Sequence, residues 1–107
     1  MKTKIYNKLV RDKIPEIIES KGDSCIVGTL GENEYIKMLD EKLFEELCEY
    51  RAFHEIEELA DLLEVVYASC DALGYSRDEL EKARAKKAEL RGGFEKRILL
   101  KEVHEKD

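Results

Sequence analysis

Residues 45–63 read Glu-Glu-Leu-Cys-Glu-Tyr-Arg-Ala-Phe-His-Glu-Ile-Glu-Glu-Leu-Ala-Asp-Leu-Leu, and this stretch decides the fold. Glu46 and Glu49 stand three residues apart in its first half, and Glu58 and Asp61 repeat that spacing in its second half. Residues three apart lie on one face of an α-helix. The stretch therefore predicts two antiparallel helices, joined by a tight turn, with four carboxylates converging between them.

Apolar residues at helical spacing extend both helices away from the turn. The first is expected from its N-cap, Asn33, to about Tyr50, with an apolar stripe of Ile36, Leu39, Leu43 and Leu47. A brief break is expected over residues 51–54. The second helix is expected from about Glu55 to Leu73, where Gly74 is a good stop signal.

This second helix has apolar residues on nearly all sides. Ile56, Leu59, Leu63, Val66 and Cys70 cover one side, while Leu62 and Val65 share the other side with Glu58 and Asp61. The pattern predicts burial on both sides. A buried carboxylate must be paired, protonated or bound to a metal ion, because an uncompensated charge is costly away from water.

Shorter elements are expected on either side of this pair. Ser76 and Glu79 form a capping box that opens a helix ending near Leu90. Asp12 is expected to cap a short helix to about Ser20, with Pro15 in its first turn. Three further segments are less regular: residues 3–10 predict an extended arm or short strand, residues 24–30 a short strand or link, and residues 94–103 either a strand or a helix.

The chain has 107 residues, which predicts one domain over 1–107 with an all-α fold of four to five helices in a bundle. Short extended segments are expected at its N- and C-terminal ends. A helical chain of this size buries a modest core, so we expect oligomerisation to cover the remaining apolar surface.

Charge is unevenly distributed along the chain, whose net charge is −6. Residues 40–64 carry ten acidic against two basic residues, whereas residues 1–21 carry six basic against three acidic ones and residues 77–101 nine against five. This arrangement suits cations bound at the centre and anions bridging to the flanks; solvated helix faces explain it equally well. A nucleic acid polymer is not an expected partner of a chain with this net charge.

The three cysteines are widely spaced and form no CxxC pair, which indicates a reducing compartment rather than a disulfide framework. No apolar run is long enough to span a bilayer, and the N-terminal residues lack the apolar core of a signal peptide. We therefore expect a cytoplasmic protein that is not associated with a membrane.

Several carboxylates without neighbouring His or Cys ligands suit a hard cation, Mg²⁺ or Mn²⁺. The alternative is an exposed acidic helix face that forms salt bridges with the basic flanks. The spacing of the acids leaves both open.

The acidic stretch resembles the paired ExxE and ExxD motifs of the MazG-like nucleotide pyrophosphohydrolases. Two further segments resemble a small subgroup of that family, often described as phosphoribosyl-ATP pyrophosphohydrolase-like. Residues 6–15 resemble the N-terminal segment of that subgroup and read Tyr-Asn-Lys-Leu-Val-Arg-Asp-Lys-Ile-Pro. Residues 87–94 resemble its C-terminal segment and read Lys-Ala-Glu-Leu-Arg-Gly-Gly-Phe. The resemblance covers nearly the whole chain. It departs from most relatives in the eight residues, 50–57, that separate the two motifs.

This resemblance implies an oligomeric all-α enzyme that cleaves the α–β phosphoanhydride of a nucleotide, giving a monophosphate and pyrophosphate. It implies assembly as a homodimer or homotetramer and Mg²⁺ ligands at Glu46, Glu49, Glu58 and Asp61. Glu45 and Glu46 are the candidate catalytic residues, and Glu45 would either support the ligands from behind or orient water; an exposed helix acid is the alternative for Glu45. A house-cleaning role against non-standard nucleotides fits the resemblance. Hydrolysis of phosphoribosyl-ATP in histidine synthesis, and a non-catalytic acidic module that binds a basic protein, are the alternatives.

Phosphoanhydride hydrolysis also needs cations that neutralise phosphate charge. Lys87 and Arg91 lie four residues apart on one helix face and are candidates to bind phosphates. Lys8, Arg11 and Lys13 near the N-terminus are further candidates, contributed within the chain or across a subunit boundary. Both groups are also compatible with solvated basic surfaces.

Overall fold

The protein is described here by a computed structural model covering residues 2–107, in which every regular element is a helix. The helices are α1 (Ile14–Ser20), α2 (Glu32–Phe53), α3 (Ile56–Ala72) and α4 (Arg77–Arg91). The expected all-α fold with extended ends is confirmed for these residues. The tail over residues 94–103 was expected as a strand or a helix, and that expectation is wrong, because the segment is neither.

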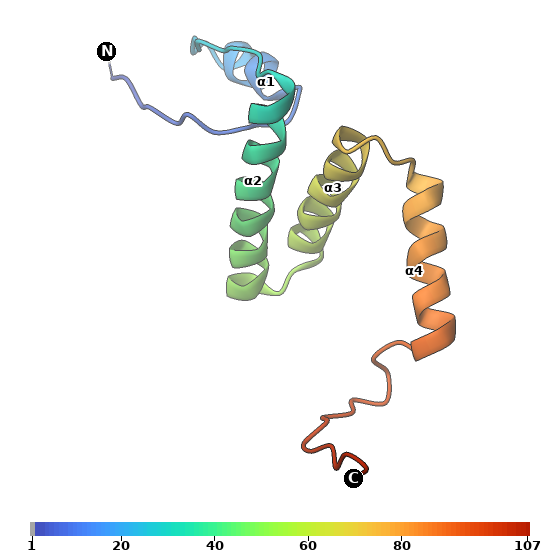
Figure 1. Ribbon diagram of the computed structural model, residues 1–107. Coiled ribbons are helices and arrows are strands. Elements are labelled where there is room, and N and C mark those ends of the chain that lie inside the picture. The colour runs from blue at the N-terminus through green and yellow to red at the C-terminus, as the bar shows by residue number, and fades with distance from the viewer. Residues whose placement is uncertain (1) are drawn as a thin grey trace.

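The two long helices form an antiparallel hairpin, α2–α3, with a connection of only two residues (Figure 1). α2 continues to Phe53, through the first three residues of the predicted break at 51–54, because no Gly or Pro interrupts it. His54 then reverses the chain in the left-handed conformation, with φ of 53°, and its N–H donates to the carbonyl of Tyr50 at 2.7 Å. α3 lies within one residue of its predicted limits, and Gly74 follows it with φ of 88°.

The helix caps were predicted with mixed success. The capping residue Ser76 accepts a hydrogen bond from the backbone N–H of Glu79 at 3.1 Å, which confirms the predicted start of α4. Asp12 and Asn33 do not cap α1 and α2; Lys13 and Gly31 occupy those positions. A turn at the carbonyl of Arg11, which accepts from the N–H of Ile14, delays α1, and the carbonyl of Gly31 starts α2 early.

Helix packing is concentrated in the hairpin. α3 packs along α2 and touches α4, and no other helix pair is in contact within residues 2–107. Leu39, Val65 and Cys70 are the buried apolar residues of this described range. The predicted burial of α3 on both sides is therefore only partly met within one chain. The side with Val65 is covered, whereas on the other side Cys70 is buried but Ile56, Leu59 and Leu63 are exposed. The four helices do not close into a bundle by themselves.

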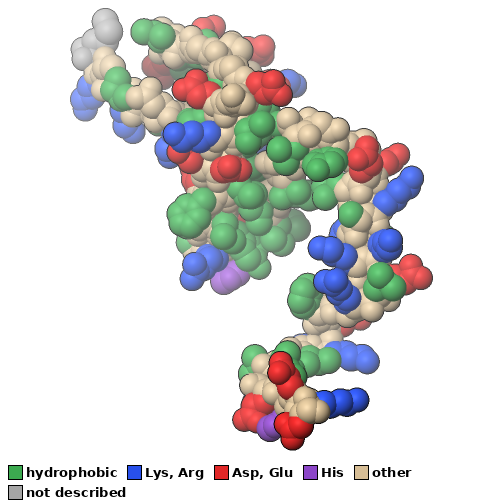
Figure 2. All heavy atoms as spheres, viewed as in Figure 1, with side chains coloured by type: hydrophobic (Ala, Val, Ile, Leu, Met, Phe, Trp, Pro, Cys, Tyr) green, Lys and Arg blue, Asp and Glu red, His purple; other side chains and the backbone are tan. Residues whose placement is uncertain are grey.

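The molecule is elongated, with principal extents of 70 × 31 × 26 Å. Its radius of gyration is 19.2 Å, whereas a compact domain of this length has about 13 Å. Figure 1 shows why: α4 and the tail after it extend away from the hairpin. Apolar side chains accordingly lie on the surface of the hairpin and the tail (Figure 2). None of the helices described is long and apolar enough to cross a bilayer.

Candidate metal centre

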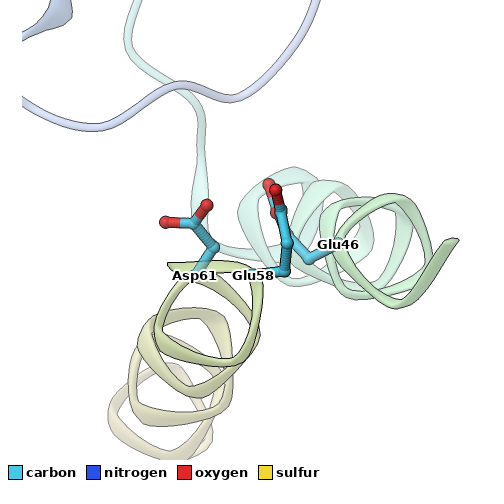
Figure 3. Close-up of side chains that lie close together, drawn as sticks. All are labelled: Glu46, Glu58 and Asp61. Carbon is cyan, nitrogen blue, oxygen red and sulfur yellow. The ribbon is translucent and has the colours of Figure 1, made fainter. Parts of the chain in front are cut away.

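Three carboxylates from the two hairpin helices converge at one point. Glu46 on α2 and Glu58 and Asp61 on α3 each offer an oxygen, and these three oxygens lie within 4.8 Å of one another. Figure 3 shows the side chains of Glu46 and Glu58 meeting across the gap between the helices, with Asp61 one turn further along α3. The helical spacing places Glu58 and Asp61 on one face, and the short turn brings that face to α2.

The convergence of these acids is unusual because part of it is buried. Glu46 is only 6% exposed, the one buried charged residue of the described chain. Its Oε2 is shielded from solvent and accepts no hydrogen bond, and the same holds for Oε2 of Glu58. Lys42, one turn earlier on α2, reaches only Oε1 of Glu46, at 3.4 Å. The site therefore has two buried carboxylate oxygens to which no described residue donates a hydrogen bond.

Proton affinities reflect this excess of negative charge. Burial raises the pKa of Glu46 above its ordinary value, the charge of Glu49 raises it further, and Lys42 offsets part of the rise. The pKa of Glu58 is raised by loss of solvation, then by the charges of Glu49, Asp61 and Glu46. Groups that resist ionisation beside one another are stabilised as carboxylates when a cation binds among them.

Glu49 was predicted as a fourth ligand. The structure places it close enough for its charge to raise the pKa of Glu46 and Glu58, but not within the group of three converging oxygens. It is half-buried on α2, one turn from Glu46. Its role as a ligand stays a prediction.

Glu45, the predicted water-orienting group, lies beside the cluster between two lysines. Its Oε1 is 3.3 Å from Nζ of Lys8, and its Oε2 is 3.5 Å from Nζ of Lys42. The side chain remains 30% exposed, so one flank of this carboxylate is open to water.

The N-terminal arm, residues 2–13, brings two of the predicted phosphate-binding cations to the acids. Lys8 pairs with Glu45 on α2, and Nη2 of Arg11 lies 2.7 Å from Oδ1 of Asp61 on α3. These pairings span 37 and 50 residues. The sequence indicated the basic character of the arm but contained no local signal for its partners. Lys13 forms no ion pair among the described residues and occupies the N-cap position of α1.

The other predicted cations, Lys87 and Arg91, are not brought to the acids within this chain. α4 touches only α3, and Figure 1 shows it standing apart from α2. Neither side chain forms a hydrogen bond or ion pair with another described residue. The ion pair present in α4 joins Arg84 to Glu81, at 2.6 Å, within the helix itself.

Two shallow depressions accompany these elements. One of about 100 Å³ lies between the arm and α2, with Lys8, Leu9, Lys42 and Glu45 on its walls. Another of about 190 Å³ lies between α3 and α4, where the guanidinium carbon of Arg77 sits 4.2 Å from the ring centre of Tyr67. Pockets that enclose ligands of drug size have about 300–1,000 Å³. Neither depression in the described part of the chain is large enough to enclose a ligand of that size.

Comparison with known proteins adds one partial relative. A segment of 45 residues, 42% of this chain, is 49% identical to an uncharacterized protein of Mycolicibacterium smegmatis. The match spans 46% of that protein, so the chain covers about half the length of this curated relative. No family model matches the chain. No solved structure is similar to it either.

Proposed function

We propose that this protein is a Mg²⁺-dependent nucleotide pyrophosphohydrolase of the MazG-like kind, active as a homo-oligomer. The observation that carries the proposal is the meeting of Glu46, Glu58 and Asp61, each with one oxygen within 4.8 Å of the others. In addition, Oε2 of Glu46 and Oε2 of Glu58 are buried without a hydrogen-bond donor. Burying such oxygens is costly unless a cation neutralises them. The reaction class comes from the order of the motifs and their flanks.

The donor set fits a hard divalent cation. All three converging ligands are carboxylates, and no His or Cys belongs to the group. Mg²⁺ prefers oxygen ligands and is usually held by a few carboxylates together with substrate phosphates, and Mn²⁺ accepts the same ligands. Glu46, Glu58 and Asp61 would hold the ion, with Glu49 as the candidate fourth ligand.

When bound, such an ion supplies positive charge that neutralises phosphate oxygens and makes nearby water easier to deprotonate. The side chains have complementary tasks. Glu45 would accept the proton of the attacking water, while Lys8 and Arg11, which pair with Glu45 and Asp61 here, would bind phosphate oxygens from the arm. The water oxygen forms a bond to phosphorus, one bond between phosphorus and the bridging oxygen breaks, and a monophosphate and pyrophosphate leave.

Uncovered surface supports assembly with further copies. The chain exposes 10479 Å², about 4,300 Å² more than a compact monomer of its mass. Obligate homo-oligomers bury interfaces of about 2,000–5,000 Å² or more. The exposed apolar residues include Leu59 and Leu63 on α3 and the residues Phe94, Ile98, Leu99, Leu100 and Val103 in the tail. A second copy covering these residues gives the chain the core that it lacks alone.

Charge complementarity suggests which parts of two copies meet. Residues 40–64 form the strongly acidic hairpin, and residues 82–101 carry eight basic against two acidic side chains. Within one chain these regions form no ion pair with each other among the described residues. Placing α4 of one copy against the hairpin of the other brings Lys87 and Arg91 toward the phosphates and encloses the nucleotide.

Pyrophosphate release from a panel of nucleotides tests the proposal. The panel includes canonical and oxidised or methylated nucleoside triphosphates and phosphoribosyl-ATP, each measured with and without Mg²⁺. The variants are Glu58→Gln and, as a matched control, Glu57→Gln, which removes the same charge from the neighbouring exposed position. We expect Mg²⁺-dependent release that Glu58→Gln abolishes and Glu57→Gln preserves.

The same panel separates the alternatives. Turnover confined to phosphoribosyl-ATP assigns the protein to histidine synthesis. No release from any nucleotide, together with no binding of Mg²⁺ or Mn²⁺ by calorimetry, rejects the enzyme and leaves the acidic protein-binding module.

A further inference from the structure

The N-terminal arm is attached to the hairpin by side chains rather than by backbone hydrogen bonds. Leu9 is half-buried beside α2, and the two ion pairs of Lys8 and Arg11 follow on either side of it. No backbone hydrogen bond joins the described residues of the arm to α2 or α3. The side chain of Arg11 can therefore change its partner without breaking any backbone pairing, while Leu9 keeps the arm in place.

Arg11 differs from Lys8 in the carboxylate that it contacts. Lys8 pairs with Glu45, which lies outside the group of converging oxygens, whereas Arg11 pairs with Asp61, a member of that group. A guanidinium is charged at every relevant pH, so Arg11 neutralises Asp61 for as long as the two side chains remain in contact. A divalent cation at the cluster competes for that carboxylate and repels the guanidinium beside it.

The guanidinium also has unused capacity. One contact from Nη2 is formed, although the group carries five N–H donors in a planar fork. The Arg11 side chain is 56% exposed, so it is accessible to a ligand from solvent. Phosphate oxygens match this fork and form shorter, stronger hydrogen bonds than neutral acceptors do.

We propose that Arg11 exchanges partners during assembly of the site: it pairs with Asp61 in the metal-free protein and is transferred to a substrate phosphate when the cation binds. The inference rests on the proposed function, because it takes the carboxylate cluster as the cation site. Metal and phosphate binding then reinforce each other, and the coupling is reciprocal. Metal binding frees the guanidinium for phosphate, and phosphate binding removes the competitor of the metal.

The opposite role for Arg11 is that of a fixed positioning residue, holding Asp61 in the orientation that the cation needs. The two roles predict opposite signs for the metal affinity of Arg11→Ala. Removing a competitor strengthens metal binding, whereas removing a positioning residue weakens it. The sign of one measured change therefore separates them.

The experiment is a calorimetric titration with Mn²⁺, without nucleotide, of the wild type, Arg11→Ala and the control Lys4→Ala. Lys4 lies in the same arm and forms no ion pair with a described residue, so its removal corrects for the loss of one positive charge. We expect Arg11→Ala to bind Mn²⁺ about two- to fivefold more tightly than Lys4→Ala, the range that an exposed ion pair allows. Circular dichroism of each variant confirms that it is folded.

The second arm of the experiment uses inorganic tripolyphosphate with saturating Mn²⁺. We expect Arg11→Ala to bind it about tenfold more weakly than Lys4→Ala, as for the loss of a charged hydrogen bond. Mn²⁺ binding by Arg11→Ala that is equal to or weaker than that of Lys4→Ala overturns the exchange while leaving the metal site intact. Equal tripolyphosphate binding overturns the transfer to phosphate. Absence of Mn²⁺ binding in all three proteins instead rejects the metal site, and the exchange with it.

Discussion

Lys42 neutralises only one side of Glu46: its Nζ lies 3.4 Å from Oε1, while Oε2 is buried with no hydrogen-bond donor. The two residues are one helical turn apart, so this half-satisfied pairing is built into α2 itself. Across the gap, Oε2 of Glu58 is in the same condition. The α2–α3 hairpin therefore folds despite a local excess of negative charge. We expect its thermal stability, its response to Mg²⁺ and its pH dependence to reflect that excess.

Substituting Glu46 by Gln should stabilise the metal-free protein. The change removes a buried charge whose loss of solvation outweighs the attraction of Lys42, so we expect a gain of the order of 1 kcal/mol. In a domain of this size that gain is about 4–8 °C in Tm. Thermal unfolding followed by circular dichroism, with EDTA present, measures it. Glu57→Gln should leave Tm nearly unchanged, and a lower Tm for Glu46→Gln would contradict the account of the site.

Mg²⁺ should reverse the order of stability between these proteins. An ion that binds only the folded state raises Tm, and the rise grows with the logarithm of its concentration relative to Kd. The wild type and Glu57→Gln should therefore gain stability in millimolar Mg²⁺ and lose it again on adding EDTA, whereas Glu46→Gln should not respond. The same melts, repeated with and without the ion, provide the test. An equal shift for all three proteins would place the ion elsewhere.

The pH dependence of stability should have a definite sign. The pKa values of Glu46 and Glu58 are raised in the folded chain, so this chain binds more protons than the unfolded one just above the ordinary value of 4.5. The contribution of these two groups to folding stability is fully present below pH 4.5, and it is lost as the pH rises through their raised pKa values. Relative to Glu46→Gln/Glu58→Gln, the metal-free wild type should lose stability as the pH rises from 4 to 7.

Urea unfolding across that pH range measures the difference, and Glu81 provides a control of opposite sign. Arg84 lowers the pKa of Glu81, so its contribution is present above the ordinary value and is lost as the pH falls. The wild type should therefore gain stability relative to Glu81→Gln as the pH rises. Parallel curves for the wild type and the double variant would show that the carboxylates of Glu46 and Glu58 do not titrate differently on folding.

Removing residues 94–107 should weaken the assembly. The deletion takes away five exposed apolar side chains, Phe94, Ile98, Leu99, Leu100 and Val103, each of which has no cover within the chain. Light scattering coupled to size exclusion gives the molar mass, and dividing it by the mass of one chain gives the number of copies per particle. That number should be smaller for the deletion, or should fall on dilution. The matched control removes only residues 104–107, which are polar, and should keep the number of copies found for the full chain. The same number of copies for the two truncations would exclude residues 94–103 from the interface.

Mixing two inactive variants should restore activity if the site is shared between copies. Glu58→Gln removes a ligand from the hairpin, and Arg91→Ala removes a phosphate-binding candidate from α4. In randomly mixed dimers, about half of the molecules are heterodimers, each with one intact site, which gives about a quarter of wild-type activity. Co-expression with two affinity tags and assay of pyrophosphate release measures this. No recovery in the purified heterodimer would place both residues of a site on one chain.

Helix limits that depend on residues close together in the sequence were predicted well in some places and wrongly in others. The capping box at Ser76 and Glu79, the stop at Gly74 and the limits of α3 depend on local chemistry, and all agree with the structure. The caps at Asp12 and Asn33 were wrong because backbone turns just before and after them set the helix starts. The break at residues 51–54 was wrong because the chain reverses through a single left-handed residue, His54.

Features that depend on distant residues were predicted less well. Spacing placed Glu58 and Asp61 on one face, and the short turn brought them to Glu46, so the cluster was expected from the sequence. Nothing in the sequence distinguished Glu46, whose Oε2 is buried, from Glu49. The pairing of Arg11 with Asp61 spans 50 residues and has no periodic signal. Periodicity also showed that α3 has two apolar sides without showing that one of them is left uncovered by this chain.

The connection at His54 and Glu55 has a consequence for how this chain can vary. Only two residues connect α2 to α3, so an added residue in this turn would shift the start of α3 relative to α2. One residue advances a helix by about 1.5 Å and rotates it by about 100°, which turns Glu58 and Asp61 away from Glu46. The three carboxylates can therefore converge only if the length of this turn is kept. An insertion that would be harmless in most surface loops would, at this position, dismantle the centre while leaving every one of its residues in the chain.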